Sequence, residues 1–73
     1  MYEMVEDVKE YSGYRGNERP VSFVYKNTFF EVEEIISNWR EPGGRLFFEV
    51  KTTNGEKFLL CYFEDLDKWF VKY

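Results

Sequence analysis

The stretch RLFFEVKTTNGEKFLLCYFE, residues 45–64, carries the clearest fold signal in the chain. Apolar and polar side chains alternate on both sides of Asn54-Gly55, and an Asn-Gly pair between two alternating runs is the strongest short-range signature of a β-hairpin. With Asn54-Gly55 as a two-residue loop, three cross-strand pairs are apolar and form the predicted core face: Val50 with Leu59, Phe48 with Cys61, and Leu46 with Phe63. The other face is mixed in polarity, with Arg45, Phe47, Glu49 and Lys51 opposite Glu64, Tyr62, Leu60 and Phe58. We expect another strand or the N-terminal residues to cover part of that mixed face.

A second hairpin is predicted upstream, in RPVSFVYKNTFFEVEEIISNWR, residues 19–40. A loop at Lys26-Asn27 matches every cross-strand pair in polarity, and these pairs are Phe23 with Phe30, Val21 with Val32, and Ser22 with Glu31. A loop at Asn27-Thr28 would instead set Val24 against Glu31 and Val21 against Glu34. The first register is therefore preferred, and Val21, Phe23, Phe30 and Val32 are expected to be buried. It also places Asn27 where the backbone needs a left-handed conformation, which Asn tolerates.

These hairpins, with turns at EPGG (residues 41–44) and EDLD (residues 64–67), predict an all-β fold. Five antiparallel strands are expected in a meander that forms a curled sheet or a small open barrel. Their approximate ranges are 21–26, 28–37, 45–53, 56–63 and 68–73. In the last strand, Trp69, Val71 and Tyr73 fall on one side.

The N-terminal segment, residues 1–12, has two interpretations. An apolar stripe at helical spacing fits a short covering helix, whereas an edge strand with outward-facing acids fits equally well. The stripe comprises Met1, Met4, Val5, Val8 and Tyr11. An irregular connection, SGYRGNERP, follows, and residues 13–73 are expected to form a single small β domain behind this acidic leader.

Composition excludes several kinds of chemistry. The 73 residues contain sixteen aromatic side chains (Phe 8, Tyr 6, Trp 2), which is enough for a rich core, and no run of apolar residues could span a bilayer.

The net charge of −4 is uneven: four acids and one base give −3 in residues 1–12, and ten acids and nine bases give −1 in residues 13–73. Neither part resembles a duplex-DNA binder. The absence of His excludes Ser-His-Asp and Cys-His catalysis, and no cofactor or metal is expected.

Cys61 is the only cysteine, so no intramolecular disulfide can form, and an unpaired thiol suits a reducing compartment such as the cytoplasm. Its place in the apolar set of its strand predicts a buried, unreactive thiol.

Most of the short motifs have a structural interpretation. GYRG (residues 13–16) has the spacing of the KH-domain loop, but the strands downstream favour a plain turn. EDLD lacks the length of a calcium-binding loop and is interpreted as a solvated turn. Glu31, Glu33 and Glu34 are interpreted as the solvent-exposed side of a strand that contains a bulge or bend, rather than as catalytic carboxylates.

The opening hairpin and the end of the chain resemble a small uncharacterised bacterial all-β family with an Arg-Pro/aromatic hairpin and a Trp-Arg signature. The matching residues are Arg19, Pro20, Phe23, Tyr25, Phe30, Val32, Trp39, Arg40, Trp69 and Phe70. The resemblance covers residues 16–73, and Asn27 stands where the family usually has Gly, a change that suits the same turn. Members of this family have no established activity, but some are associated with error-prone DNA polymerase genes. The resemblance therefore implies a link to DNA repair.

Two functions from different classes remain. The first is a non-catalytic protein-interaction module of a bacterial cytoplasmic protein, which would use an exposed sheet edge or the mixed face around Phe47, Phe58, Leu60 and Tyr62. The alternative is a single-stranded nucleic-acid binding module that stacks bases on aromatic rings and holds phosphates with Arg40, Arg45, Lys51, Lys68 and Lys72. Clustering of these bases beside exposed aromatic residues would favour the alternative, and pairing with acids would favour the first. In both cases the predicted contacts are Trp39, Arg40, Arg45 and Phe47, which bracket the EPGG turn at one end of the sheet.

Overall fold

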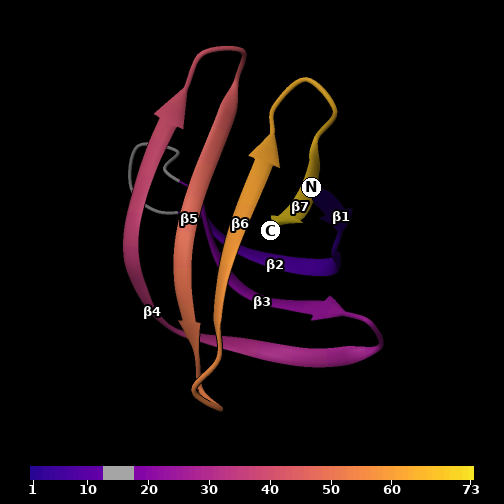
Figure 1. The fold of residues 1–73 in the computed structure, drawn as a ribbon, viewed down its shortest axis with the longest axis vertical. Helices are drawn as coiled ribbons and strands as arrows, with labels where there is room; N and C mark the ends of the chain where they lie inside the picture. Colours follow the sequence, from indigo (N-terminus) through magenta and orange to yellow (C-terminus); the bar gives the residue numbers. More distant parts are fainter. Residues whose placement is uncertain (13–17) are drawn as a thin grey trace.

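The chain forms one curled, open antiparallel sheet, shown in Figure 1, and the part of the chain that the structure describes contains no helix. The structure is a computed structural model that describes residues 1–12 and 18–73. Its strands are β1 (Tyr2–Met4), β2 (Glu6–Ser12), β3 (Glu18–Tyr25), β4 (Thr28–Glu41), β5 (Arg45–Thr52), β6 (Lys57–Phe63) and β7 (Lys68–Lys72). They lie in the order β1-β7-β6-β5-β4-β3-β2. The predicted all-β antiparallel class is thus confirmed, with seven strands instead of five. The GYRG motif lies outside the described residues.

The two extra strands come from the N-terminal leader. The covering-helix interpretation of residues 1–12 is therefore wrong, and the edge-strand interpretation is confirmed. β1 pairs with β7 at one edge of the sheet, and β2 pairs with β3 at the other. Val5 lies between them, and its N–H donates to the carbonyl oxygen of Trp69 at 3.2 Å. One short segment therefore joins both edges of the curl, and Figure 1 shows the indigo β1 beside the yellow β7.

β4 is the strand that bends the sheet. Its first residues, Thr28 to Glu31, pair with β3, and the residues from Val32 onward pair with β5. The ladder to β5 shifts twice, between Val32 and Glu34 and between Ile35 and Ser37. Each shift adds a residue to one strand, and such bulges bend and twist it. Figure 1 shows the result: β4 runs along β3 and then turns upright beside β5.

The β3–β4 hairpin has the predicted loop. Lys26 and Asn27 both have positive φ, 50° and 62°, as a type I′ turn requires. Phe23 pairs with Phe30, and their rings stack at 5.4 Å inside the curl. The predicted burial of Val21 is wrong, because its side chain is 45% exposed. The ladder to β2 steps from the pair Lys9–Ser22 to the pair Glu10–Pro20, so Val21 is the extra residue of a bulge and turns outward.

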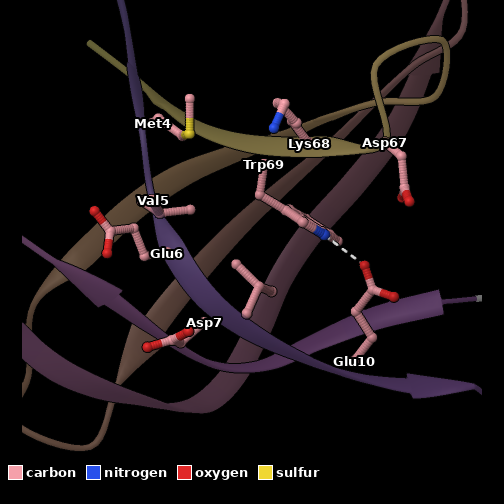
Figure 2. Close-up of a pocket in the computed structure, with 9 residues that line it drawn as sticks. Met4, Val5, Glu6, Asp7, Glu10, Asp67, Lys68 and Trp69 are labelled. Atoms are coloured by element: carbon pink, nitrogen blue, oxygen red, sulfur yellow. Dashed lines mark hydrogen bonds between the residues drawn. The ribbon is translucent and has the colours of Figure 1, made fainter.

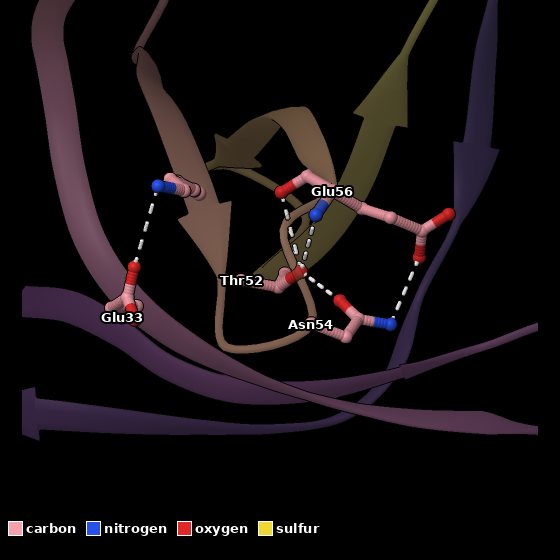
Figure 3. Close-up of polar contacts among 5 residues, drawn as sticks. Glu33, Thr52, Asn54 and Glu56 are labelled. Carbon is pink, nitrogen blue, oxygen red and sulfur yellow. Dashed lines mark hydrogen bonds and ion pairs between the residues drawn. The ribbon is translucent and has the colours of Figure 1, made fainter.

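The β5–β6 hairpin turns where predicted, but its loop is one residue longer. Gly55 donates its N–H to the carbonyl of Thr52 at 2.9 Å, and Thr52 donates its own N–H to the carbonyl of Glu56 at 2.8 Å. This is a three-residue loop, Thr53-Asn54-Gly55, with Gly55 at φ +87°. Figure 3 shows the side-chain contacts of this loop: the Thr52 hydroxyl contacts the Asn54 side chain and both the N–H and the carbonyl of Glu56.

Because the loop is one residue longer than predicted, each β6 side chain lies on the face opposite to the predicted one. A shift of one residue in register moves every side chain of a strand to the opposite face. The observed pairs are Val50 with Phe58, Phe48 with Leu60, Phe47 with Cys61, and Leu46 with Tyr62. The predicted pairing of Phe48 with Cys61 is therefore wrong, and Phe58, Leu60 and Tyr62 belong to the core face and not to the predicted contact face.

The core fills the inside of the curl. Its buried side chains are Val5, Phe23, Phe30, Phe48, Val50, Leu60, Trp69 and Val71. The ring of Phe58 packs edge-on against both the Phe23 ring and the Phe30 ring, at 5.3 and 4.9 Å, and so connects β6 to the β3–β4 hairpin. Trp69 and Val71 share the core side of β7 as predicted, whereas Tyr73 follows that strand and is exposed.

Candidate interaction face

The outer side of the sheet carries a second, partly exposed aromatic layer. Residues directly opposite each other in an antiparallel ladder point to the same face. Trp39 pairs with Phe47, Phe47 with Cys61, Cys61 with Phe70, and Phe70 with Met4. These pairings form one continuous row across five strands on the side away from the core. We call this side of β1, β4, β5, β6 and β7 the outer face.

The Trp39–Phe47 pair is the one parallel stack among the ring pairs described on the outer face. The two rings lie 5.3 Å apart and nearly parallel, at 9°. Phe47 is only 1% exposed, whereas Trp39, stacked on it, is 41% exposed. The indole N–H of Trp39 donates to the carboxylate of Glu41 at 3.0 Å, which fixes the ring from a second direction. A large aromatic surface is thus held in one orientation and open to solvent.

Three further rings continue the layer toward the other edge of the sheet. The rings of Phe63 and Phe70 lie 4.7 Å apart, and Tyr2 meets Phe63 edge-on at 5.2 Å. Cys61 lies fully buried between Phe47 and Phe70 in the row. Burial raises the pKa of the Cys61 thiol to about 11, so the thiol is protonated at neutral pH. Cys61 is therefore buried as predicted, although on the face opposite to the one expected.

Two cations lie on the aromatic rings of this face. The guanidinium of Arg45 is 4.3 Å from the ring centre of Phe63. The ammonium of Lys72 is 5.5 Å from the ring centre of Phe47 and 5.7 Å from that of Tyr2. These distances are typical of cation–π contacts. The outer face of this acidic chain therefore presents positive charge among its rings.

The predicted contact residues do not all lie together. Trp39, Phe47 and Arg45 share the outer face, with Phe47 buried beneath the tryptophan. Arg40 alternates with Trp39 along β4, pairs with Leu46 of the core side, and forms an ion pair with Glu64 at 2.6 Å. Its guanidinium is thus held on the opposite face.

The other predicted bases divide in the same way. Lys51 lies 3.7 Å from the carboxylate of Glu33, also drawn in Figure 3, so it is paired with an acid as Arg40 is. Lys68 pairs with Phe63 in the ladder and so lies on the outer face. Of the five predicted bases, Arg40 and Lys51 are paired with acids, which favours a protein partner. Arg45, Lys68 and Lys72 lie beside aromatic residues, which favours single-stranded nucleic acid.

Sequence reasoning missed three aromatic residues of this face as contacts: Tyr2, Phe63 and Phe70. A three-residue loop after Thr52 would have placed Phe63 on the same side as Phe47, because the register of β6 follows from the loop length. Tyr2 had no such signal, since it reaches the outer face only through the pairing of β1 with β7.

The remaining sequence motifs lie in turns and on solvent-exposed strand surfaces, as expected. Glu64 to Asp67 form a turn, and Glu31, Glu33 and Glu34 are all exposed, with a bulge between Val32 and Glu34. Within residues 1–12 and 18–73, no three carboxylate or thiol side chains converge as metal ligands. The same residues include no helix that is long and apolar enough to span a membrane.

Comparison of the chain with protein-family models, characterised proteins and solved structures finds no similar protein. The resemblance to the bacterial Trp-Arg family therefore stays a prediction, and the outer face is interpreted from its own geometry.

Proposed function

We propose that this chain is a non-catalytic protein-interaction module and that it binds its partner through the outer face. The observation that carries the proposal is the Trp39–Phe47 stack, in which an indole 41% exposed is pinned on a buried ring. Residues that dominate protein interfaces are enriched in Trp, Tyr and Arg, and a ring already fixed in place loses little side-chain entropy on binding. Trp39, Tyr2 and Arg45 supply these three residue types on one face.

The charges of the molecule also support a protein partner. Arg40 and Lys51 are each paired with an acid, and the chain is acidic overall, so a long polyanion would meet repulsion outside the outer face. On the outer face itself, Glu41 and Glu49 stand among the cations, and Glu49 accepts a hydrogen bond from Ser37 at 3.0 Å. Mixed charge around an aromatic centre is typical of the rim of a protein–protein interface.

A photo-crosslinking amino acid at position 39 tests this function. Introduced in native cells, it should form a discrete adduct with one protein, which mass spectrometry would identify. The matched control is position 29, because Phe29 is also exposed, at 60%, but lies in the part of β4 that pairs with β3. Equal adduct patterns at positions 39 and 29 would show that the outer face has no special role.

Single-stranded nucleic acid is a second candidate, favoured by one observation: Arg45 and Lys72 lie beside aromatic rings, which is the combination that holds phosphates and stacks bases. Titration with a short oligothymidylate tests it. If it binds, the Trp39 indole signal should shift, and binding should weaken steeply as salt is added. No shift at low salt would exclude this candidate and leave the protein-partner proposal.

A further inference from the structure

A groove opens on the other side of the molecule, where the two edges of the curled sheet separate. β1 stays on β7 as far as Val5, and beyond Val5 the chain turns to pair with β3 as β2. In Figure 2 the two strands diverge from Val5, and Trp69 of β7 points toward Glu10 of β2. The opening is a groove of about 490 Å³. We call it the seam groove; its lining residues include Val5, Val8, Glu10, Asp67, Lys68 and Trp69.

The bottom of the seam groove is apolar and well packed. Val5 and Trp69 are 4% and 6% exposed, and Val8 packs against the same core. The indole N–H of Trp69 donates to the Glu10 carboxylate at 2.5 Å, which links the two sides of the groove. An apolar bottom of this kind can hold the aliphatic stem of a long side chain.

The walls of the seam groove are negative. Four lining carboxylates, those of Glu6, Asp7, Glu10 and Asp67, stand against the single ammonium of Lys68, so the net charge of the lining is −3. A guest with positive charge is therefore favoured, and one with negative charge is repelled.

One wall is also a free strand edge. β2 is the last strand of the sheet, and the pairings of the described residues leave it bonded to β3 alone. Such an edge presents unpaired backbone N–H and C=O groups, which an extended peptide can use by adding as another strand. A second copy of the same edge would bring together two segments that each carry Glu6, Asp7 and Glu10 against the single base Lys9, so the net charge repels and self-pairing is disfavoured.

We propose that the seam groove binds an extended, basic segment of a partner protein, which adds to the edge of β2. The backbone of the segment pairs with β2, and its lysine or arginine side chains lie between Glu10 and Asp67 with their stems over Trp69. This site borders the outer face at Met4 and Lys68, which belong to both surfaces, but its acidic residues and Trp69 are not part of the outer face. The chain would therefore have two docking surfaces of opposite electrostatic character.

The two tryptophans allow each surface to be monitored separately by NMR. The probe is a capped hexapeptide of alternating lysine and valine, and the control is the same peptide with glutamate in place of lysine. The lysine peptide should shift the Trp69 indole signal and the amide signals of β2 while leaving the Trp39 indole signal unchanged. Its affinity should fall as salt is raised, because the attraction is between charges near the surface.

Paired substitutions identify the groove residues. Glu10→Gln with Asp67→Asn removes two charges but keeps an acceptor for the Trp69 N–H and one for the Tyr62 hydroxyl. We expect this variant to bind the lysine peptide about 3- to 30-fold more weakly. The matched control, Glu31→Gln with Asp65→Asn, removes two exposed charges that do not line the groove and should bind as the wild type does.

Three negative results would overturn the proposal, and a fourth would move the binding to the other surface; the first three leave the outer-face function testable on its own. They are an unmoved Trp69 signal at low salt, an equal response to the glutamate peptide, and equal weakening by the groove pair and the control pair. A response at Trp39 and Arg45 instead would make the outer face the peptide site and refute binding in the seam groove.

Discussion

The two faces of the β4–β7 part of the sheet are both rich in aromatic residues, yet only the inner one is covered. On the inner face, Phe48 and Trp69 pack against each other in the core and are each 6% exposed. On the outer face, Trp39 and Tyr2 are 41% and 38% exposed. The inner aromatic residues are explained by the need of a small domain for a core. The outer ones exceed that need, and exposed apolar clusters are typical of interaction surfaces, which is why we propose that role for the outer face.

The largest expected effect is on the inner face. Phe23 is fully buried and contacts the rings of Phe30 and Phe58, so Phe23→Ala should destabilise the fold by about 3–5 kcal/mol. A domain of this size has little more stability than that, so the variant should be largely unfolded. Circular dichroism during thermal denaturation measures it. The control is Phe29→Ala, at an exposed position of the same hairpin, which should change stability by about 0.5 kcal/mol at most. Similar melting curves for Phe23→Ala and the wild type would mean that the inner face is not the core.

The thiol beneath the outer layer gives a pH-dependent test of how well that layer is sealed. The pKa of Cys61 is raised from 9.0 to about 11 by burial. Between pH 9 and 11 the native thiol keeps its proton while the unfolded thiol loses it, so the free energy of unfolding falls as pH rises through this window. Urea unfolding at several pH values measures the effect.

Cys61→Ala is the control for that measurement, because it removes the thiol and leaves the titration of the other groups unchanged. The wild type should lose more stability than the variant between pH 9 and 11. Parallel curves, or rapid labelling of native protein by a thiol reagent at pH 8, would show that the outer layer admits solvent to Cys61.

The loop that decides which face each β6 residue occupies gives a smaller effect. Gly55 has φ +87°, and no atom lies within 4 Å of the position that a Cβ would occupy. Gly55→Ala should therefore cost only backbone strain, about 1–2 kcal/mol. Gly55→Asn should cost less, because Asn tolerates positive φ. Equal melting temperatures for the two variants would contradict a left-handed residue at this place in the loop.

The two hairpins show how far the sequence predicts this fold. In β3–β4, moving the loop by one residue sets Glu31 against Val24, so the polarity pattern selects a single register. In β6, the run KFLLCYF is apolar on both faces, and either register buries hydrophobic side chains. In the observed register the hydroxyl of Thr52 bonds across the loop to Glu56, and these bonds favour the three-residue loop. The alternation of apolar and polar residues does not predict that contact.

The same limit applies to the outer face. Trp39, Arg45 and Phe47 were predicted to lie near each other because they flank one turn, and the structure does place them on one face. Arg40 is separated from them by strand alternation, which sends neighbouring residues to opposite sides. Tyr2 joins the face through a pairing between the two ends of the chain, and no local pattern predicts a contact of that range.

Arg40 and Arg45 give the smallest and most selective test of the difference between the two faces. They are five residues apart on either side of the EPGG turn, but Arg40 pairs with Glu64 on the inner side and Arg45 lies over Phe63 on the outer side. Each contact is exposed, so Arg40→Gln and Arg45→Gln should each change stability by less than about 1 kcal/mol.

Binding should nevertheless separate the two variants. Once the partner has been identified by crosslinking at position 39, Arg45→Gln should weaken its binding because the guanidinium lies on the proposed contact surface. Arg40→Gln should bind as the wild type does, since its side chain is held away from that surface by Glu64. Titration calorimetry of the two variants with the partner makes the comparison. Equal losses of affinity would place the contact around the EPGG turn itself, within reach of both arginines, and not on the outer face.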